Sequence, residues 1–399
     1  MSNVTALESQ HVLQTYKRQP VVFVRGQGSR LFDENGKSYL DFISGIGVCV
    51  LGHAHPGLAA AVSEQAKTLI HISNLYFHPL QGQLAAKLAS KSGLQRTFFC
   101  NSGTEAVEAC LKFARRYFYS KGVKNRTQYV ALHHGFSGRS MGALSVTANA
   151  NYREPFGPLI PGVTFVAPDD IRGLEAAVTP ATAAVIAEPI QGEGGVRPLS
   201  PEFAAAIARV TKQTGTLLIA DEIQCGLGRT GHQFHYQSFG WTPDLVTVGK
   251  ALGSGIPIGA ALVAEQVAAQ IFAGDHGTTY GGNLLATRAA LYVLEQLDTL
   301  APHIAAAGAR FEQKLLDLQR KHKVVTSIRG AGLMRGLELA VDAQPVVAAA
   351  LQSGLLVNRT AEKVVRMLPP LNVTAAEIDE AASILDAALA SVSVEEVKA

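Results

Sequence analysis

Two stretches, LLIADEIQ at residues 217–224 and LVTVGK at residues 245–250, decide the fold class of this 399-residue chain, because each begins with a short apolar run, at 217–220 and at 245–248. Each run is short and almost wholly aliphatic, as the buried strands of a parallel sheet are. An ionisable residue comes after each run, Asp221 directly after the first and Lys250, behind Gly249, after the second. Parallel strands end at one edge of a sheet, so both side chains are expected to face a common crevice.

Further apolar runs of the same kind alternate with helical stretches such as residues 58–70 and 83–94. The expected strands cover residues 97–100, 129–132, 163–166, 183–187, 217–220, 245–248 and 260–263. This alternation predicts an α/β fold with a mostly parallel sheet that helices cover on both faces.

The two ends of the chain predict smaller units. Asn35-Gly36 is a hairpin turn signal among expected strands at residues 21–25, 31–33 and 37–42. A long helix at 285–297 leads to a second α/β unit, with helices at 311–320, 345–352 and 375–390 and a strand at 333–339. We therefore expect an N-terminal hairpin segment (1–55), a large cofactor-binding domain (56–300) and a small C-terminal domain (301–399).

The composition excludes several classes of protein. The net charge is only +3, with no long basic run, which argues against binding to nucleic acid or a membrane surface. No signal-peptide core and no bilayer-length apolar stretch is present, so a soluble cytoplasmic protein is expected. The four cysteines form no C-x-x-C pair and are expected to be free buried thiols. Two histidine pairs, His53-x-His55 and His133-His134, lack the carboxylate or cysteine spacing of a metal site.

The segment after the strand at 97–100 suits a phosphate. Ser102 and Glu105 have the spacing of a capping box, and good helix-forming residues follow them. Gly103 would let the backbone approach a ligand, and free N–H groups at a helix N-terminus bind anions. Taken alone, the segment fits an ordinary helix start better than a phosphate site.

Asp221 and Lys250 together indicate pyridoxal-phosphate chemistry. A buried aspartate at a strand end can keep a pyridine nitrogen protonated, and a lysine at the next strand end can form an imine. The simpler roles are a helix cap for Asp221 and a solvated surface position for Lys250. Phe136, between glycines and serine, could stack on the ring or belong to the core.

A G-x-G-x-x-G pattern at residues 226–231 raises the alternative of a nicotinamide-dependent dehydrogenase. A dinucleotide fingerprint joins a strand directly to a helix. Here residues 221–225 intervene after the strand, and no convincing helix follows Gly231. The P-loop pattern is also absent around Lys250, because Ala251 stands where serine or threonine is needed.

Nearly the whole chain resembles the class III aminotransferases of fold type I. The resemblance is carried by the segments at 24–56, NSGTEAVEACLKFAR (101–115), HHGFSGRS (133–140), AEPIQGEGG (187–195), ADEIQCGLGRTG (220–231), VGKALGSGIPIGA (248–260), HGTTYGGN (276–283) and VVRMLPPL (364–371). Ser137 and Leu284 depart from the family pattern, where histidine and proline are usual.

The resemblance implies a role for each matching residue. Lys250 would be the Schiff-base lysine and proton shuttle, with Asp221 on the pyridinium nitrogen and Gln224 near the ring hydroxyl. The remaining cofactor contacts would be Phe136 and Ile223 on the ring faces, Ser102, Gly103 and Thr104 on the phosphate, and Thr279 on the phosphate of a neighbouring subunit. The substrate contacts would be Arg139 on a carboxylate, Thr278 nearby, and Glu193 with Arg366 as a pair that masks and unmasks an arginine.

The implied activity is that of a homodimeric transaminase with shared active sites and 2-oxoglutarate as amino acceptor. The segments HISNLYF (71–77), LLVN (355–358) and VVRMLPPL resemble the acetylornithine subgroup of the family, which implies N2-acetylornithine as donor and a place in arginine biosynthesis. Succinylornithine, ornithine and 4-aminobutyrate are alternative donors. An aminomutase with the same cofactor is an alternative of a different class.

Overall fold

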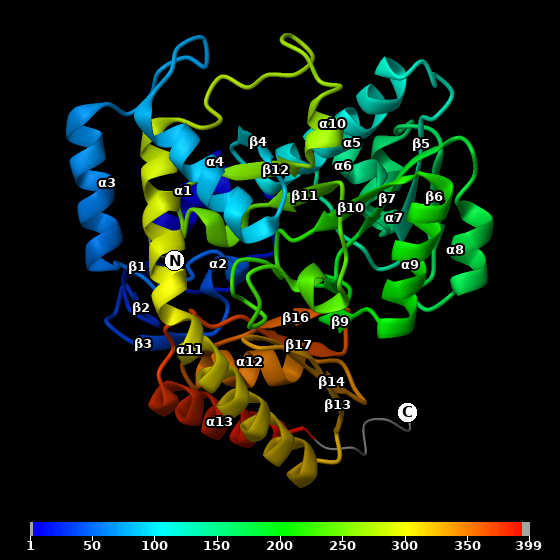
Figure 1. The fold of residues 1–399 in the computed structure, drawn as a ribbon. Coiled ribbons are helices and arrows are strands. Elements are labelled where there is room, and N and C mark those ends of the chain that lie inside the picture. The colour runs from blue at the N-terminus through cyan, green and yellow to red at the C-terminus, as the bar shows by residue number, and fades with distance from the viewer. Residues whose placement is uncertain (1–2, 393–399) are drawn as a thin grey trace.

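A computed structural model describes residues 3–392 (Figure 1), with a seven-stranded sheet at its centre. The strands are β4 (Arg96–Cys100), β5 (Gln128–Leu132), β6 (Val163–Val166), β7 (Thr182–Ala187), β10 (Leu217–Asp221), β11 (Leu245–Val248) and β12 (Gly259–Val263), in the order β4-β12-β11-β10-β7-β5-β6. β12 runs antiparallel to both neighbours, whereas the pairs from β11 to β6 are parallel. The prediction of a mostly parallel sheet is confirmed.

Helices cover both faces of this sheet because successive strand residues, which point to opposite faces, are apolar on both faces. Leu218 and Ala220 of β10 pack in the core that contains α9 (Pro201–Thr214), whereas Leu217 and Ile219 pack in the core that contains α5 (Gly103–Ser120). The remaining helices and short strands around the sheet are α6 (Met141–Ser145), α7 (Ala150–Arg153), α8 (Ile171–Ala177), α10 (Glu265–Ala268), β8 (Ile190–Gln191) and β9 (Arg197–Pro198).

The N-terminal strands form a second sheet with a strand from the far end of the chain. After α1 (Asn3–His11), strands β1 (Phe23–Gln27), β2 (Arg30–Asp33) and β3 (Ser38–Asp41) pair antiparallel, and β15 (Leu355–Leu356) adds in parallel to β3. The expected turn is present: Gly36 has φ +82° and its N–H donates to the Asp33 carbonyl at 3.0 Å.

The C-terminal part is an α/β unit, as expected, but its sheet has more strands than the sequence indicated. β13 (Val325–Ala331), β14 (Met334–Leu339), β17 (Val364–Met367) and β16 (Asn358–Thr360) form it, with α12 (Gln344–Gln352) and α13 (Ala375–Ala390) packed nearby. Only β14 was expected as a strand.

The two helices expected at 285–297 and 311–320 are one helix, α11 (Leu284–Lys321), of 38 residues. Pro302 lies inside it, although an interior proline costs about 3 kcal/mol or more. The apolar stripe continues on both sides of Pro302, from Leu291 to Leu318, and this burial outweighs the cost. α3 (Pro56–Thr68) and α4 (Pro79–Ser92) contact α11, and so does α13 (Figure 1).

The expected domain boundary at residue 300 falls inside α11, so the division into domains stays a prediction. The short α2 (Ser44–Gly47) completes the elements that surround the central sheet. Among residues 3–392, no helix has both the length and the apolar character needed to cross a membrane.

Candidate active site

Asp221 ends β10 and is buried, with 2% of its surface exposed. Its Oδ1 accepts hydrogen bonds from the Thr247 hydroxyl (2.8 Å) and the Ile223 N–H (3.3 Å), whereas its Oδ2 is buried without a partner. Burial raises the pKa of this carboxyl group, and the bond from Thr247 opposes that rise. A buried, unpartnered carboxylate oxygen is costly unless a ligand supplies a donor.

Lys250 is separated from the end of β11 by Gly249 alone and begins a single 3-10 turn that ends at Leu252. Its backbone lies in the left-handed region, with φ +36°, which costs a residue with a side chain about 1–3 kcal/mol. Burial lowers the pKa of the Lys250 ammonium, and the Glu193 carboxylate partly offsets this shift. A lysine with a lowered pKa is more readily available as a neutral nucleophile.

The N-terminus of α5 presents free donors next to Lys250. The Ser102 hydroxyl accepts from the Glu105 N–H at 3.4 Å. The Glu105 carboxylate, however, binds the N–H of Asn101 (2.5 Å), one residue before the cap, so the reciprocal capping box was a wrong prediction. The N–H groups of Gly103 and Thr104 have no acceptor in the described part of the chain, as an anion site requires.

Two glycines allow the start of α5 to pack closely against Ile223 and against the 136–140 loop. A Cβ at Gly103 would lie 2.8 Å from Cδ1 of Ile223, too close for any other residue. Gly138 has φ +138°, and its Cβ would meet the Thr104 hydroxyl at 2.3 Å. That hydroxyl is hydrogen-bonded to Ser140 (2.7 Å), which ties the 136–140 loop to the start of α5.

A cavity of about 280 Å³ brings most of the expected cofactor residues together. Its lining consists of Ser102, Gly103, Thr104, Phe136, Ser137, Gly138, Arg139, Glu188, Asp221, Ile223, Gln224 and Lys250. Pyridoxal phosphate fits this set: Oδ2 of Asp221 lacks a donor such as a pyridinium N–H, and the free N–H groups of α5 lack an anion. The amine of Lys250 faces the same space.

Glu193 and Arg366 form an ion pair, although 173 residues separate them in sequence. Oε1 of Glu193 lies 2.5 Å from a guanidinium nitrogen of Arg366, a residue of β17 that is 1% exposed. Oε1 of Gln224 accepts from the same arginine at 3.1 Å, which joins the pair to the cofactor cavity. Burial opposes ionisation of Glu193, yet Arg366 lowers its pKa overall.

Thr278 and Thr279 do not line the cavity either, and unlike the Glu193–Arg366 pair they have no hydrogen bond, within the part of the chain that the structure describes, to a residue that does. The Thr278 hydroxyl accepts from the Asn101 side chain at 3.2 Å, and Thr279 is exposed. Within one chain, therefore, neither residue contacts the space where the cofactor is expected.

Sequence reasoning assigned no role to Glu188, which lies in the cavity wall. This buried carboxylate follows β7 and accepts from the N–H groups of Phe136 (2.8 Å) and Gly192 (3.1 Å). Burial raises its pKa, and the nearby Asp221 adds to the shift. Its position after a buried strand, the same as that of Asp221, was the available indication.

The glycine pattern at 226–231 is no dinucleotide site. The next element after it is a single 3-10 turn, His235–Phe239, instead of the helix that a pyrophosphate needs. Residues 3–392 also contain no group of three or more His, Cys, Asp or Glu side chains arranged for a metal ion. Of the four free cysteines, three are buried as expected, and Cys49 is partly exposed.

Comparisons with known proteins agree with this geometry. The family model described as Aminotransferase class-III matches residues 12–389. An acetylornithine aminotransferase of Aquifex aeolicus is 44% identical over 94% of this chain and 98% of its own length. An ornithine aminotransferase structure from Toxoplasma gondii, described with partial occupancy of PLP at the active site, has a TM-score of 0.93 and 33% identity and covers 99% of this chain and 96% of its own.

An N-acetylornithine aminotransferase structure from Stenotrophomonas maltophilia K279a is also 33% identical, with a TM-score of 0.84, and covers 97% of this chain and 98% of its own. Family match, fold and site thus agree over nearly the whole length of the sequence. This chain belongs to the class III aminotransferases, which are transaminases that depend on pyridoxal phosphate.

Proposed function

We propose that this transaminase takes the amino group of N2-acetylornithine and delivers it to 2-oxoglutarate, giving N-acetylglutamate 5-semialdehyde and glutamate, as a step of arginine biosynthesis. Relatives that are 42–46% identical over most of the chain are named acetylornithine aminotransferases. The Glu193–Arg366 pair beside the cofactor cavity is the observation that carries the proposal, because it suits two substrates of different charge.

The cofactor, when bound, carries the amino group between substrates and withdraws electrons from the reacting carbon. Around it, Asp221 holds the proton on the ring nitrogen with its free Oδ2, and Lys250 holds the cofactor and then moves the proton of the reacting carbon. Ser102 and the N–H groups of Gly103 and Thr104 bind the phosphate. The remaining contacts are Phe136 and Ile223 on the ring faces and Gln224 near the ring hydroxyl.

The two substrates place opposite demands on the site. N2-acetylornithine has one carboxylate, whereas 2-oxoglutarate has two. Arg139 can bind one carboxylate of either substrate in a bidentate pair. A second free arginine would help the acceptor, but it would be left unpaired beside the donor, which is costly in a closed site. Glu193 resolves this conflict if it pairs with Arg366 while the donor is bound and moves away for the acceptor.

Glu193→Gln is therefore expected to slow the half-reaction with the donor more than the half-reaction with 2-oxoglutarate. The amide cannot neutralise Arg366, so the arginine stays unmasked throughout. Single-turnover rates for each half can be followed by the colour of the cofactor. Equal losses in both halves would show that the ion pair only holds the structure together.

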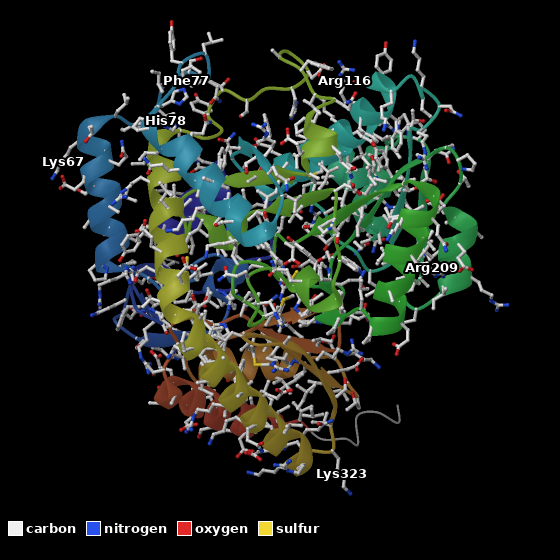
Figure 2. All side chains as sticks on the ribbon, in the orientation of Figure 1. Lys67, Phe77, His78, Arg116, Arg209 and Lys323 are labelled. Atoms are coloured by element: carbon white, nitrogen blue, oxygen red, sulfur yellow. The ribbon has the colours of Figure 1, made fainter. Side chains whose placement is uncertain are left out.

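We further propose that two copies of the chain form a dimer with shared active sites. Leu75, Phe77 and Tyr280 are large apolar residues that are 85%, 104% and 62% exposed. They lie on neighbouring loops, because the Asn74 side chain donates to the carbonyls of Thr278 (3.3 Å) and Gly281 (2.9 Å). Phe77 lies at the edge of the molecule (Figure 2). A partner subunit that covers this surface would receive Thr279 at its phosphate and Thr278 near its substrate.

Thr279→Ala should weaken cofactor binding on the order of ten- to hundredfold, because one hydrogen bond to a charged group contributes about 1.5–3 kcal/mol. Titration of the cofactor-free protein with pyridoxal phosphate measures this change. In a mixed dimer of Lys250→Ala and Thr279→Ala subunits, one site should carry both defects and the other neither. Normal cofactor affinity in the Thr279→Ala homodimer would exclude the proposed contact.

A donor screen with 2-oxoglutarate tests the proposed substrate. N2-acetylornithine is expected to give the highest kcat/KM among acetylornithine, succinylornithine, ornithine and 4-aminobutyrate. Dependence on 2-oxoglutarate distinguishes all of these transaminases from an aminomutase, which needs no acceptor. A preference for ornithine or 4-aminobutyrate would overturn the proposed donor but not the family assignment.

A further inference from the structure

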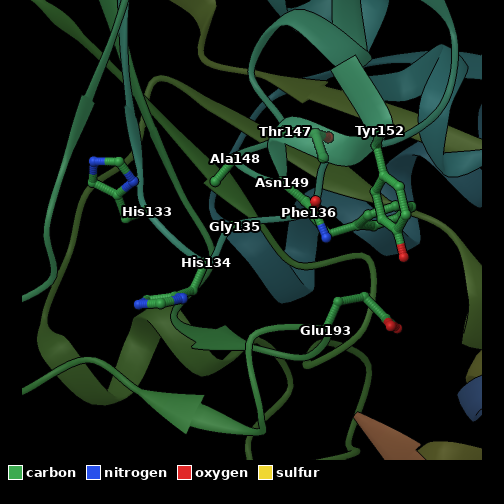
Figure 3. A pocket seen from close by; sticks show the side chains of 9 residues that line it. All are labelled: His133, His134, Gly135, Phe136, Thr147, Ala148, Asn149, Tyr152 and Glu193. Carbon is green, nitrogen blue, oxygen red and sulfur yellow. The ribbon is translucent and has the colours of Figure 1, made fainter. Parts of the chain in front are cut away.

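A second cavity, whose lining is drawn in Figure 3, shares Phe136 with the cofactor cavity. Its volume is about 230 Å³, and we call it the side chamber. Its lining consists of His133, His134, Gly135, Phe136, Thr147, Ala148, Asn149, Tyr152 and Glu193. None of the expected cofactor contacts except Phe136 belongs to it, so the side chamber is available to another part of a ligand.

Tyr152 connects the side chamber to Arg139. The guanidinium carbon of Arg139 lies 3.6 Å from the centre of the Tyr152 ring, a cation–π contact, and 5.8 Å from that of Phe136. Tyr152 stands on α7, whose first turn is capped by the Asn149 side chain through a 3.0 Å bond from the Asn151 N–H. Arg139 forms no ion pair within residues 3–392, so its N–H edge is free for a carboxylate.

The chemistry of the side chamber suits a neutral polar group. Glu193, its one acidic residue, is paired with Arg366. Burial lowers the pKa of His134, which favours the uncharged form of that imidazole. The Asn149 amide and the Tyr152 hydroxyl remain as uncharged hydrogen-bonding groups, and Figure 3 shows that hydroxyl on the same side of the cavity as the Glu193 carboxylate.

The covalent geometry of the donor links the carboxylate site at Arg139 to the side chamber. In an N-acylated amino acid, the carboxylate carbon and the acylated nitrogen share one carbon atom and lie about 2.5 Å apart. A carboxylate on Arg139 therefore places the acyl group next to the Tyr152 ring. An acetamido group has four heavy atoms, on the order of 100 Å³ at the volume of a water molecule each, and the side chamber has room for it.

We propose that the side chamber receives the neutral acyl group of the donor while Arg139, held flat against Tyr152, binds the donor carboxylate. The inference rests on the proposed function and assigns Tyr152 and Ala148 to substrate recognition. It also gives a reason for preferring the acylated donor to free ornithine, which would bring an ammonium group instead of a neutral acyl group next to the guanidinium of Arg139.

The test uses the holoenzyme and N-acetylnorvaline, the donor with its reacting amine replaced by hydrogen, in calorimetric binding measurements. Ala148→Leu fills the side chamber and should weaken N-acetylnorvaline binding at least about tenfold. The half-reaction with 2-oxoglutarate, which has no acyl group, should change less than about threefold. Ala150→Leu is the matched control, since Ala150 is exposed and outside the side chamber, and it should behave like the unmodified enzyme.

A second pair of variants isolates Tyr152. Tyr152→Leu removes the aromatic contact with Arg139 and should weaken both N-acetylnorvaline and 2-oxoglutarate roughly three- to thirtyfold, since both need the carboxylate site. Tyr152→Phe keeps the ring and should affect 2-oxoglutarate little. Ala148→Leu is thus expected to affect mainly the acylated ligand, whereas Tyr152→Leu is expected to affect both ligands. A general loss of structure would not produce this difference between the two variants.

The outcomes separate the inference from the proposed function. Selective loss of N-acetylnorvaline binding in Ala148→Leu supports the side chamber, even if a donor screen were to reject N2-acetylornithine as the natural substrate. If the unmodified enzyme uses N2-acetylornithine but Ala148→Leu affects neither ligand, or both equally, the side-chamber proposal is overturned and the proposed function stands.

Discussion

Lys250→Ala is expected to reduce turnover on the order of 10⁴-fold, the upper end of what a positioned acid–base group contributes. The variant loses the amine that we propose both holds the cofactor and moves the substrate proton. Among residues 3–392, no other lysine lines the cavity, so no amine of this described part of the chain is placed to replace it. Steady-state assays with the donor and 2-oxoglutarate measure the loss.

Borohydride reduction of the unmodified holoenzyme, followed by peptide mapping, gives an independent check. The label should appear on Lys250 alone. Lys250→Arg is the matched control, because it keeps a positive charge at this position but cannot form the covalent link. A labelled peptide from another part of the chain, or an active Lys250→Ala variant, would exclude this lysine.

Asp221→Asn is expected to lower turnover at least about a hundredfold, which corresponds to roughly 2.7 kcal/mol in the activation barrier. The amide has the shape of the carboxylate but no charge, so it cannot keep the ring nitrogen protonated. The pH-independent part of the kcat profile measures the change, and near-normal turnover would refute the role.

Stability provides the control for Asp221→Asn. Burial raises the pKa of Asp221 in the folded state, so its ionised form destabilises the cofactor-free fold at pH values above the pKa of the unfolded chain. Removing that charge should leave the thermal unfolding temperature of the cofactor-free protein at pH 7 unchanged or higher. A variant that is inactive because it is unfolded would show the opposite.

The sequence predicted the central sheet well because its strands are short, apolar and bounded by polar residues. It also placed Asp221 and Lys250 at neighbouring strand ends, since parallel topology alone brings them together. Contacts between distant segments gave no comparable pattern. Nothing local to Glu193 or Arg366 indicates that they meet across 173 residues, and only the family resemblance suggested it.

Two further features could not be predicted from the sequence, because they also depend on contacts between separate segments. The stacking of Tyr152 on Arg139 depends on how α7 folds back over the 136–140 loop, which periodicity does not report. The continuity of α11 was missed because Pro302 is a local helix-breaking residue, while the packing that overrides it comes from α3, α4 and α13, far away in sequence.

The length of α11 bears on how the molecule folds. At 1.5 Å per residue, its 38 residues span about 57 Å, and one apolar stripe serves partners from both ends of the chain. A protease cut near Pro302 would leave each fragment with half of the apolar stripe of α11. Part of that half would be exposed, because the elements that cover it would belong to the other fragment. The parts of the intact protein on the N-terminal and C-terminal sides of Pro302 should therefore unfold in one cooperative transition. Neither of the two fragments should be recovered as a well-folded protein by itself.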